Sequence, residues 1–184
     1  METNKLLIAI IGAGAVGLAA AAHLIKRNQP FILFETGKTV GSNILSWGHV
    51  KVFSPWKYNI DKVAEELLLQ TSWQAPDKDS SHTGKEFYDH YLKPLANHPL
   101  VKPYILTSSK EIAINRKNMD KMKTSGRNNQ AFVLYVQQGK KNTSFEARAV
   151  IDASGTWQNG NPLGSGGLLA LGEIADPKQS KFAK

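Results

Sequence analysis

The sequence predicts an α/β fold built on a parallel sheet, and two apolar runs near its start carry that prediction. Lys5 to Ile11 is almost continuously apolar, which is typical of a parallel strand buried on both faces. Phe31 to Glu35 is a second such run, and the alanine-rich segment Ala15 to Arg27 between them has the length of a helix. Pro30 prevents further helix just before the second run. Strand, helix and strand in this order predict a βαβ unit, whose strands are parallel.

Later segments predict short helices. Residues 36–60 are rich in glycine, serine, tryptophan and proline and are expected to be irregular. Asp61 to Gln70 predicts a short amphipathic helix. A further helix is expected to start at Thr83, where the Thr-x-x-Glu spacing of a capping box occurs, and to run to about Lys93, where Pro94 interrupts it.

The third section of the chain is expected to form strands joined by turns. The candidate strands are Tyr104 to Thr107, Glu111 to Asn115, Ala131 to Gln137 and Ser144 to Ala153. A hairpin turn over residues 138–142 makes part of this section a small antiparallel β-meander. We therefore expect one domain over residues 1–175 and a disordered tail over residues 176–184.

Composition and charge narrow the classes of function. The chain has 184 residues, a net charge of +8 and no cysteine. Without cysteine, a disulfide framework, a thiolate metal site and a catalytic thiol are excluded in this chain. Basic residues gather between residues 110 and 148, but no aromatic side chain interleaves with them until Phe132. This pattern favours a solvated loop and lysine-protected strand edges over a nucleic-acid surface, so no nucleic-acid partner is expected.

A targeting segment is an alternative interpretation of the N-terminal region. Leu6 to Ile25 is long and almost uncharged and follows Lys5, as in a signal peptide or a membrane span. Three observations favour the βαβ unit instead. The segment contains three glycines at phosphate-loop spacing, it ends in the basic residues Lys26 and Arg27 as a helix end does, and a second strand follows at the distance that a βαβ unit requires. We expect a cytoplasmic protein with no membrane span.

A Gly-x-Gly-x-x-Gly motif lies between the first strand and the helix, where dinucleotide-binding βαβ units carry it. Gly12 permits the tight turn off the strand, Gly14 lets the backbone approach a pyrophosphate, and Gly17 lets the helix lie against the strand. The helix start supplies unpaired amides and the positive end of its dipole to the phosphates. The segment expected to make the first nucleotide contact is Gly12, Ala13, Gly14, Ala15, Val16 and Gly17.

Glu35 ends the second strand, about 20 residues beyond the glycines, where an acidic residue accepts hydrogen bonds from an adenosine ribose. A carboxylate at this position also repels a 2′-phosphate, so the site is not expected to prefer NADP. The strand, the glycine motif, the helix and the acidic residue at the end of the next strand occur together here, and this combination predicts dinucleotide binding. The alternative is an ordinary glycine turn in an α/β protein.

Two later segments favour FAD over NAD as the dinucleotide. Residues 46–56 form an aromatic loop, and the flat side chains of Trp47, Phe53 and Trp56 can line an isoalloxazine ring. The alternative for each of them is a place in the core. Residues 147–155 predict a buried strand that ends in a small-residue turn, and such a turn can return to the cofactor crevice at the carboxyl ends of the strands.

Together these features resemble the N-terminal FAD-binding part of the FAD- and NAD(P)H-dependent oxidoreductases related to flavin-containing monooxygenases, including flavoproteins associated with potassium transport. The residues that fall on that family's FAD fingerprint are Gly12, Gly14, Gly17, Ala21, Leu24 and Glu35. Asn28 replaces the usual glycine, and asparagine tolerates a left-handed helix end. Ala153, Ser154 and Gly155 resemble the family's Ala-Thr-Gly turn, and residues 40–56 resemble the loop beside the flavin. The resemblance covers residues 5–172.

The resemblance implies a Rossmann-like FAD/NAD(P)-binding domain, truncated relative to the family, that serves a flavin-dependent and monooxygenase-like oxidoreductase. FAD carries the chemistry in such enzymes, so no catalytic side chain and no metal site are predicted. The implied cofactor contacts are the glycine segment 12–17, Glu35, Trp47 and the turn 153–155. NADPH as electron donor would need a second glycine unit, which this sequence lacks.

Two other functions stay open on the sequence alone. One is a non-catalytic module that binds NAD or adenine nucleotides, and the other is a truncated remnant. A small-molecule substrate is the expected partner of the enzyme. A homo-oligomer, or a partner that supplies the missing domain, is also open.

Overall fold

The computed structural model describes residues 6–156 and 161–170. The chain divides into two units, residues 1–154 and residues 155–184. Both sheets described below belong to the first unit, and the described element of the second is the 3₁₀ turn η5 (Ser165–Gly167). The expected domain end at residue 175 and the expected tail lie outside the described residues, so that boundary stays a prediction.

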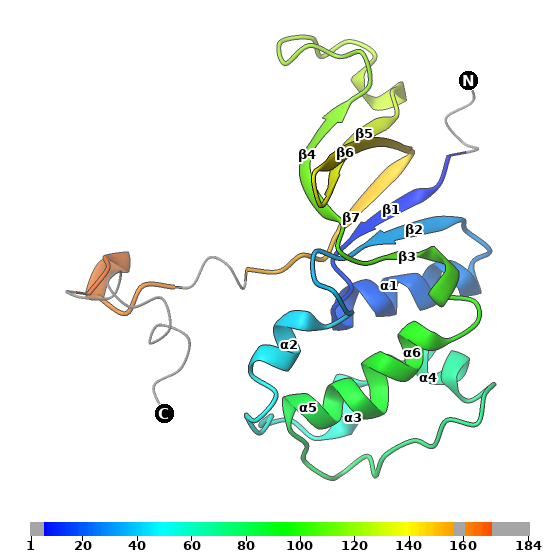
Figure 1. The fold of residues 1–184 in the computed structure, drawn as a ribbon, viewed down its shortest axis with the longest axis vertical. Helices are drawn as coiled ribbons and strands as arrows, with labels where there is room; N and C mark the ends of the chain where they lie inside the picture. The colour runs from blue at the N-terminus through cyan, green and yellow to red at the C-terminus, as the bar shows by residue number, and fades with distance from the viewer. Residues whose placement is uncertain (1–5, 157–160, 171–184) are drawn as a thin grey trace. The chain divides into compact units, whose positions relative to one another are not determined.

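A four-stranded parallel sheet organises the first unit (Figure 1). Its strands lie in the order β3-β2-β1-β7 and are β1 (Ile8–Ile11), β2 (Phe31–Phe34), β3 (Ile105–Leu106) and β7 (Ala149–Asp152). All four residues of β1 are buried, which confirms the interpretation of the continuous apolar run. The carboxyl ends of the strands meet at one edge of the sheet, and ligands of open α/β sheets bind at that edge.

Helix α1 (Ala15–Lys26) covers one face of this sheet and completes the predicted βαβ unit. Its buried positions are small or aliphatic, namely Gly17, Leu18, Ala21, Ala22 and Leu24. Asn28, just after the helix, has a φ of 52°, the left-handed conformation expected at this helix end.

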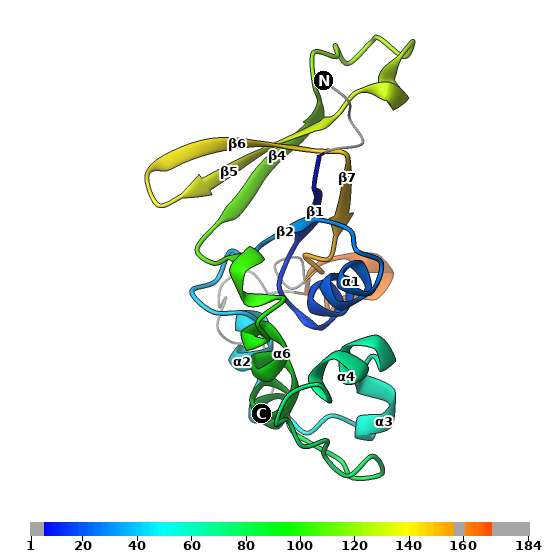
Figure 2. The ribbon, with the colours of Figure 1, turned by 90° about the vertical axis from the view of Figure 1, so that its right-hand side faces the viewer.

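An antiparallel sheet of three strands packs on the other face of the parallel sheet (Figures 1 and 2). It contains β4 (Lys110–Arg116), β5 (Phe132–Gln138) and β6 (Lys141–Ala147), in that order. One core cluster joins the two sheets, and its buried members are Ala9, Ile11, Phe34, Leu134, Val136 and Ala147. Ile8 and Ile10 point the other way, into the core shared with α1. The predicted β-meander is therefore confirmed as a separate small sheet.

The predicted strand Ser144 to Ala153 is wrong in one respect, because the chain changes sheets within it. β6 ends at Ala147 and β7 begins at Ala149, and the two belong to different sheets. At the break, the amide of Arg148 donates to the carbonyl oxygen of Leu7 at 3.0 Å, so pairing passes from β5 to β1. A residue pattern that favours strand on both sides of Arg148 cannot reveal a change of partner.

Short helices pack beyond α1, away from the parallel sheet (Figure 2). They are α3 (Trp56–Asn59), α4 (Lys62–Leu68), α5 (Gly84–Phe87), the π-helical turn η2 (Tyr88–Leu92) and α6 (Lys93–Asn97). The remaining helical elements of the first unit are α2 (Ser42–Ser46) and the 3₁₀ turns η3 (Lys102–Tyr104) and η4 (Arg127–Asn129). The expectation that residues 36–60 are irregular is wrong for α2 and α3, which are too short to show an apolar period in the sequence.

Both predicted helix starts are confirmed, whereas one predicted helix end is wrong. The Asp61 carboxylate accepts hydrogen bonds from the amides of Val63 and Ala64, and Thr83 forms the capping box with Glu86. Pro94, expected to interrupt the second helix, is instead the second residue of α6. A proline in the first turn of a helix is tolerated, because the amide that it lacks would be unpaired there. The π-helical turn η2 ends just before α6, which places Pro94 in such a first turn and lets the chain remain helical.

Candidate functional site

The glycine segment 12–17 turns off β1 in a space that admits no side chain. Gly12 has a φ of +92°, and a Cβ on it would lie 2.6 Å from the carbonyl oxygen of Ala153 at the end of β7. Its amide donates to the carbonyl oxygen of Phe34 at the end of β2. Gly12 therefore lies where β1, β2 and β7 converge.

Gly17 and Gly14 differ in what surrounds them. A Cβ on Gly17 would lie 1.8 Å from the carbonyl oxygen of Gly12, so the first turn of α1 rests directly on the loop. A Cβ on Gly14 would meet no atom within 4 Å. Gly12 and Gly17 are thus explained by packing inside the chain, but Gly14 faces open space, as expected of a residue that lets a ligand approach the backbone.

The N-terminal end of α1 has no cap of its own. Gly14 is the N-cap residue and provides no side-chain hydrogen bond, and the first turn has no acidic residue. The first amides of a helix have no partner within the helix, and the helix dipole adds positive potential at this end. The chain therefore presents unpaired donors at Ala15 and Val16, next to the open space at Gly14.

Glu35 is buried beside the glycine segment, with 8% of its surface exposed. Its Oε2 accepts a hydrogen bond from the Ala13 amide at 2.9 Å. Its Oε1 accepts from the Gly37 amide at 2.7 Å and from the Ser42 hydroxyl at 3.0 Å. The carboxylate therefore points toward the glycine segment, where the sequence places it, while its contact with a ribose stays a prediction.

Residues 37–42 close this side of the site. Gly41 donates its amide to the carbonyl oxygen of Ala13 at 2.9 Å, which completes a ring of hydrogen bonds between this segment and the glycine segment. Sequence reasoning missed Ser42 because a serine in a glycine-rich loop has no distinguishing pattern.

The turn after β7 lies next to Gly12, as predicted for Ala153 and Ser154. The Ala153 amide donates to the carbonyl oxygen of Ile11 at 2.8 Å. The Asp152 carboxylate accepts from the hydroxyl of Ser154 at 2.6 Å and from its amide at 3.0 Å, and these bonds lower the pKa of Asp152. Gly155, the third predicted residue of the turn, has a φ of +69° and begins the second unit.

The aromatic loop divides into three different environments. Trp56 is buried, with 3% exposed, and its ring stacks on His82 at a centroid distance of 4.0 Å. Trp47 is half-buried and lies over Gly84, where a Cβ would come within 2.5 Å of its ring. Phe53 is 99% exposed. The alternative of a core residue is therefore correct for Trp56, and the flavin contact predicted for Trp47 remains a prediction.

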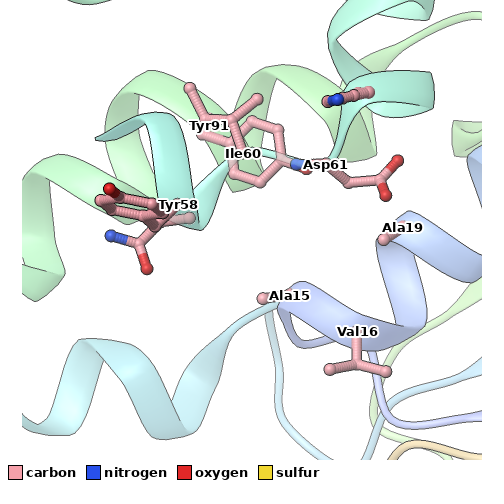
Figure 3. A pocket seen from close by; sticks show the side chains of 9 residues that line it. Ala15, Val16, Ala19, Tyr58, Ile60, Asp61 and Tyr91 are labelled. Atoms are coloured by element: carbon pink, nitrogen blue, oxygen red, sulfur yellow. The ribbon is translucent and has the colours of Figure 1, made fainter. Parts of the chain in front are cut away.

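An open pocket of about 430 Å³ lies beside the start of α1 (Figure 3). Ala15, Val16 and Ala19 of α1 line one side, and residues 58–62 and Tyr91 line the other. The Tyr91 hydroxyl accepts from the Asp61 amide, and burial raises the pKa of Tyr91 to about 12. Sequence reasoning missed this pocket because its walls come from three separate segments.

Asp61 also links this wall to α1. Its carboxylate lies 3.2 Å from Nε2 of His23. Burial raises the pKa of Asp61, but hydrogen bonds from the Ala64 amide and from His23 outweigh that effect and lower it below its usual range. Asp61 therefore links the wall of the pocket to α1.

The described residues offer neither a metal cluster nor a membrane-spanning helix. Within residues 6–156 and 161–170, no group of three acidic or histidine side chains could hold a metal ion. None of the described helices is both long and apolar enough to cross a bilayer.

Comparison with known proteins supports a Rossmann-like fold. Residues 10–75 match the family model of the NAD(P)-binding Rossmann-like domain. This match covers the second half of β1, α1, β2, Glu35 and the helices α2 to α4. No curated protein sequence matches the chain.

Solved structures with a similar fold include OTEMO, a steroid monooxygenase and a disulfide reductase. OTEMO in complex with FAD and NADP is 16% identical with a TM-score of 0.59, and oxidised steroid monooxygenase bound to NADP is 19% identical with a TM-score of 0.60. The match covers 83% and 82% of this chain, respectively, but only 26% of each monooxygenase chain. Bacillithiol disulfide reductase from Bacillus cereus is 18% identical, with a TM-score of 0.62, 88% of this chain covered and 42% of that chain.

These comparisons establish the Rossmann-like α/β fold. The chain spans about a quarter of the length of these monooxygenases. The association with potassium transport stays a prediction.

Proposed function

We propose that this chain is the FAD-binding portion of a flavin-dependent oxidoreductase of the monooxygenase type. The observation that carries the proposal is the open space at Gly14, in front of the uncapped start of α1. A bound diphosphate needs hydrogen-bond donors and enough open space at the same point, and the start of α1 beside Gly14 provides both.

The residues around this point match the parts of a dinucleotide. The amides of Ala15 and Val16 at the start of α1 would bind the diphosphate, and Glu35 would accept from the adenosine ribose. Trp47 and the turn 153–155 would lie toward the flavin. When bound, FAD supplies the redox chemistry, and the protein orients it.

The absence of cysteine supports the monooxygenase type over a disulfide reductase. The sequence contains no cysteine, so no thiol pair of this chain can exchange electrons with a flavin. Small-molecule oxidation by reduced flavin and oxygen needs no such pair. We further propose a small-molecule substrate, a cytoplasmic location and no nucleic-acid partner. NADPH is the proposed electron donor, and it would be bound by a unit that these residues do not include, supplied by a missing-domain partner. A homo-oligomer of this chain is the alternative assembly.

The visible spectrum of the purified chain tests FAD binding. After incubation with FAD and removal of free flavin, we expect bound flavin bands and a higher melting temperature. Gly14→Val should retain the fold, because it fills open space, but should lose the bound flavin. Ala113→Val, which adds the two Cγ atoms of valine at an exposed strand position, is the control and should bind normally.

Absence of bound flavin and of any thermal shift at saturating FAD would refute the proposal. Equal binding by the Gly14→Val variant would show that the ligand lies elsewhere.

A second candidate is a non-catalytic module for NAD or adenine nucleotides, favoured by the match to an NAD(P)-binding family. Calorimetry with FAD, NAD and ADP separates the two functions. Tighter binding of FAD than of ADP supports the oxidoreductase portion. Equal affinities for all three would mean that only the shared ADP half is held, as in the module.

A further inference from the structure

The Glu35 carboxylate already accepts three hydrogen bonds from its own chain. Oε1 carries two donors, the Gly37 amide and the Ser42 hydroxyl, and Oε2 carries the Ala13 amide. A carboxylate offers about four acceptor positions. About one position therefore remains, on a side chain that is only 8% exposed.

An adenosine ribose presents two hydroxyl donors to such a carboxylate. If Glu35 is to accept both, as the proposed function requires, one of its three present donors has to leave. Two of these donors are backbone amides. The Ala13 amide is held because the carbonyl oxygen of the same residue accepts from Gly41, and moving Gly37 would shift the whole turn.

Ser42 is the donor that can leave at the smallest structural change. It is the only one of the three that belongs to a side chain, and it is the first residue of the five-residue helix α2. Rotation about its Cα–Cβ bond removes the hydroxyl from Oε1 without moving the backbone.

We infer that Ser42 is a specificity-determining residue whose hydroxyl occupies the position of one ribose hydroxyl on Glu35 and gives way to it when a nucleotide binds. The inference rests on the proposed function. Without a nucleotide, Ser42 supplies a second donor to the buried Oε1 of Glu35, beside the Gly37 amide. With one, the ribose replaces the bond that Ser42 gives up.

A protein–ligand double-mutant cycle tests this exchange. The affinities of ADP and of 2′,3′-dideoxyadenosine diphosphate are measured by calorimetry for the natural chain and for Ser42→Ala. Because the variant has no hydroxyl to displace, ADP should bind about threefold to tenfold more tightly, the equivalent of one net hydrogen bond. The dideoxy compound, which has no ribose hydroxyls, should bind both proteins equally.

Two further variants serve as controls for this experiment. Ser42→Gly also removes the hydroxyl and should reproduce the gain if Ser42→Ala folds poorly. Ser80→Ala is the matched control, because it removes a hydroxyl that bonds to a backbone carbonyl, that of Asp77, away from Glu35. It should leave both affinities unchanged.

Each other outcome overturns the inference in a recognisable way. Weaker or unchanged ADP binding by both Ser42 variants would mean that Ser42 positions Glu35 or is irrelevant to it, while the proposed function stands. If the Ser42 variants bind ADP and the dideoxy compound with equally increased affinity, the effect does not depend on the ribose hydroxyls, and the substitution has enlarged the site. Failure of the natural chain to bind either ADP or FAD would refute the proposed function, and the exchange with it.

Discussion

The sequence predicts that the glycine segment 12–17 and the aromatic loop 46–56 both contact a nucleotide cofactor, but the residues of the two segments lie in different kinds of environment. Each glycine has a role in backbone geometry that the motif predicts, with Gly12 and Gly17 packed against carbonyl oxygens and Gly14 open. The aromatic side chains share no common role, since Trp56 is buried and Phe53 is exposed. A glycine motif constrains the backbone locally, whereas the destination of a side chain depends on which other segments fold against it.

The largest expected effect separates two aromatic residues of the same loop. Trp56→Ala should lower the free energy of unfolding by about 3–5 kcal/mol, because it leaves a cavity under His82 and Phe87. Phe53→Ala should change it by less than about 0.5 kcal/mol, because that ring is exposed. Urea denaturation of both variants measures the difference. Similar losses would mean that the loop is one packed unit and would weaken the contrast with the glycine segment.

The next effect separates two glycines. Gly17→Ala should lower the free energy of unfolding by about 3 kcal/mol, because its Cβ meets the Gly12 carbonyl oxygen. Gly14→Ala should cost less than about 1 kcal/mol, since the new methyl group meets nothing and only the N-cap preference is lost. Thermal and urea denaturation provide the comparison. A large loss in Gly14→Ala would contradict the assignment of this glycine to ligand approach.

The smallest effect is a pH dependence that belongs to the support of the aromatic loop. His82 is 2% exposed, and among the described residues its Nδ1 has no hydrogen-bond partner. Burial lowers the pKa of His82 below 6.5, and the nearby Glu86 only partly opposes this. The unfolded chain therefore binds the proton more readily, so stability is greatest above pH 6.5 and falls as the pH decreases below that value.

Melting temperatures of the natural chain and of His82→Phe between pH 7.5 and about pH 5 measure this contribution. The variant should show a shallower decline. Part of the slope should remain, because burial also lowers the pKa of His98. An unchanged slope would mean that His82 does not couple the aromatic loop to pH.

Much of the fold could be predicted wherever the decisive interactions are local. The strand β1, the helix α1 and the caps Asp61 and Thr83 follow from apolar spacing and from side-chain bonds within three residues. The change of sheets at Arg148 could not be predicted, since both partner strands lie far away in the sequence. Continuation of the helix through Pro94 depends on a π-helical turn that no residue pattern announces.

The same division applies to the candidate site. The sequence predicted contacts at the glycine segment, at Glu35 and at the turn after β7, and the structure places Gly12 against both neighbouring strands. The bond from Ser42 to Glu35 and the pocket beside Ala15 were not predicted, because each joins residues whose proximity is created by folding.

The amino-acid sequence by itself determined the βαβ unit, the positions of its glycines and the acid at the end of β2, since strand and helix periods and glycine's freedom at positive φ act over a few neighbouring residues. Only the tertiary structure decided where Trp56 and Phe53 lie, how many donors Glu35 already carries, and which segments face the start of α1. These depend on contacts between distant segments, and such contacts form only when the whole core packs.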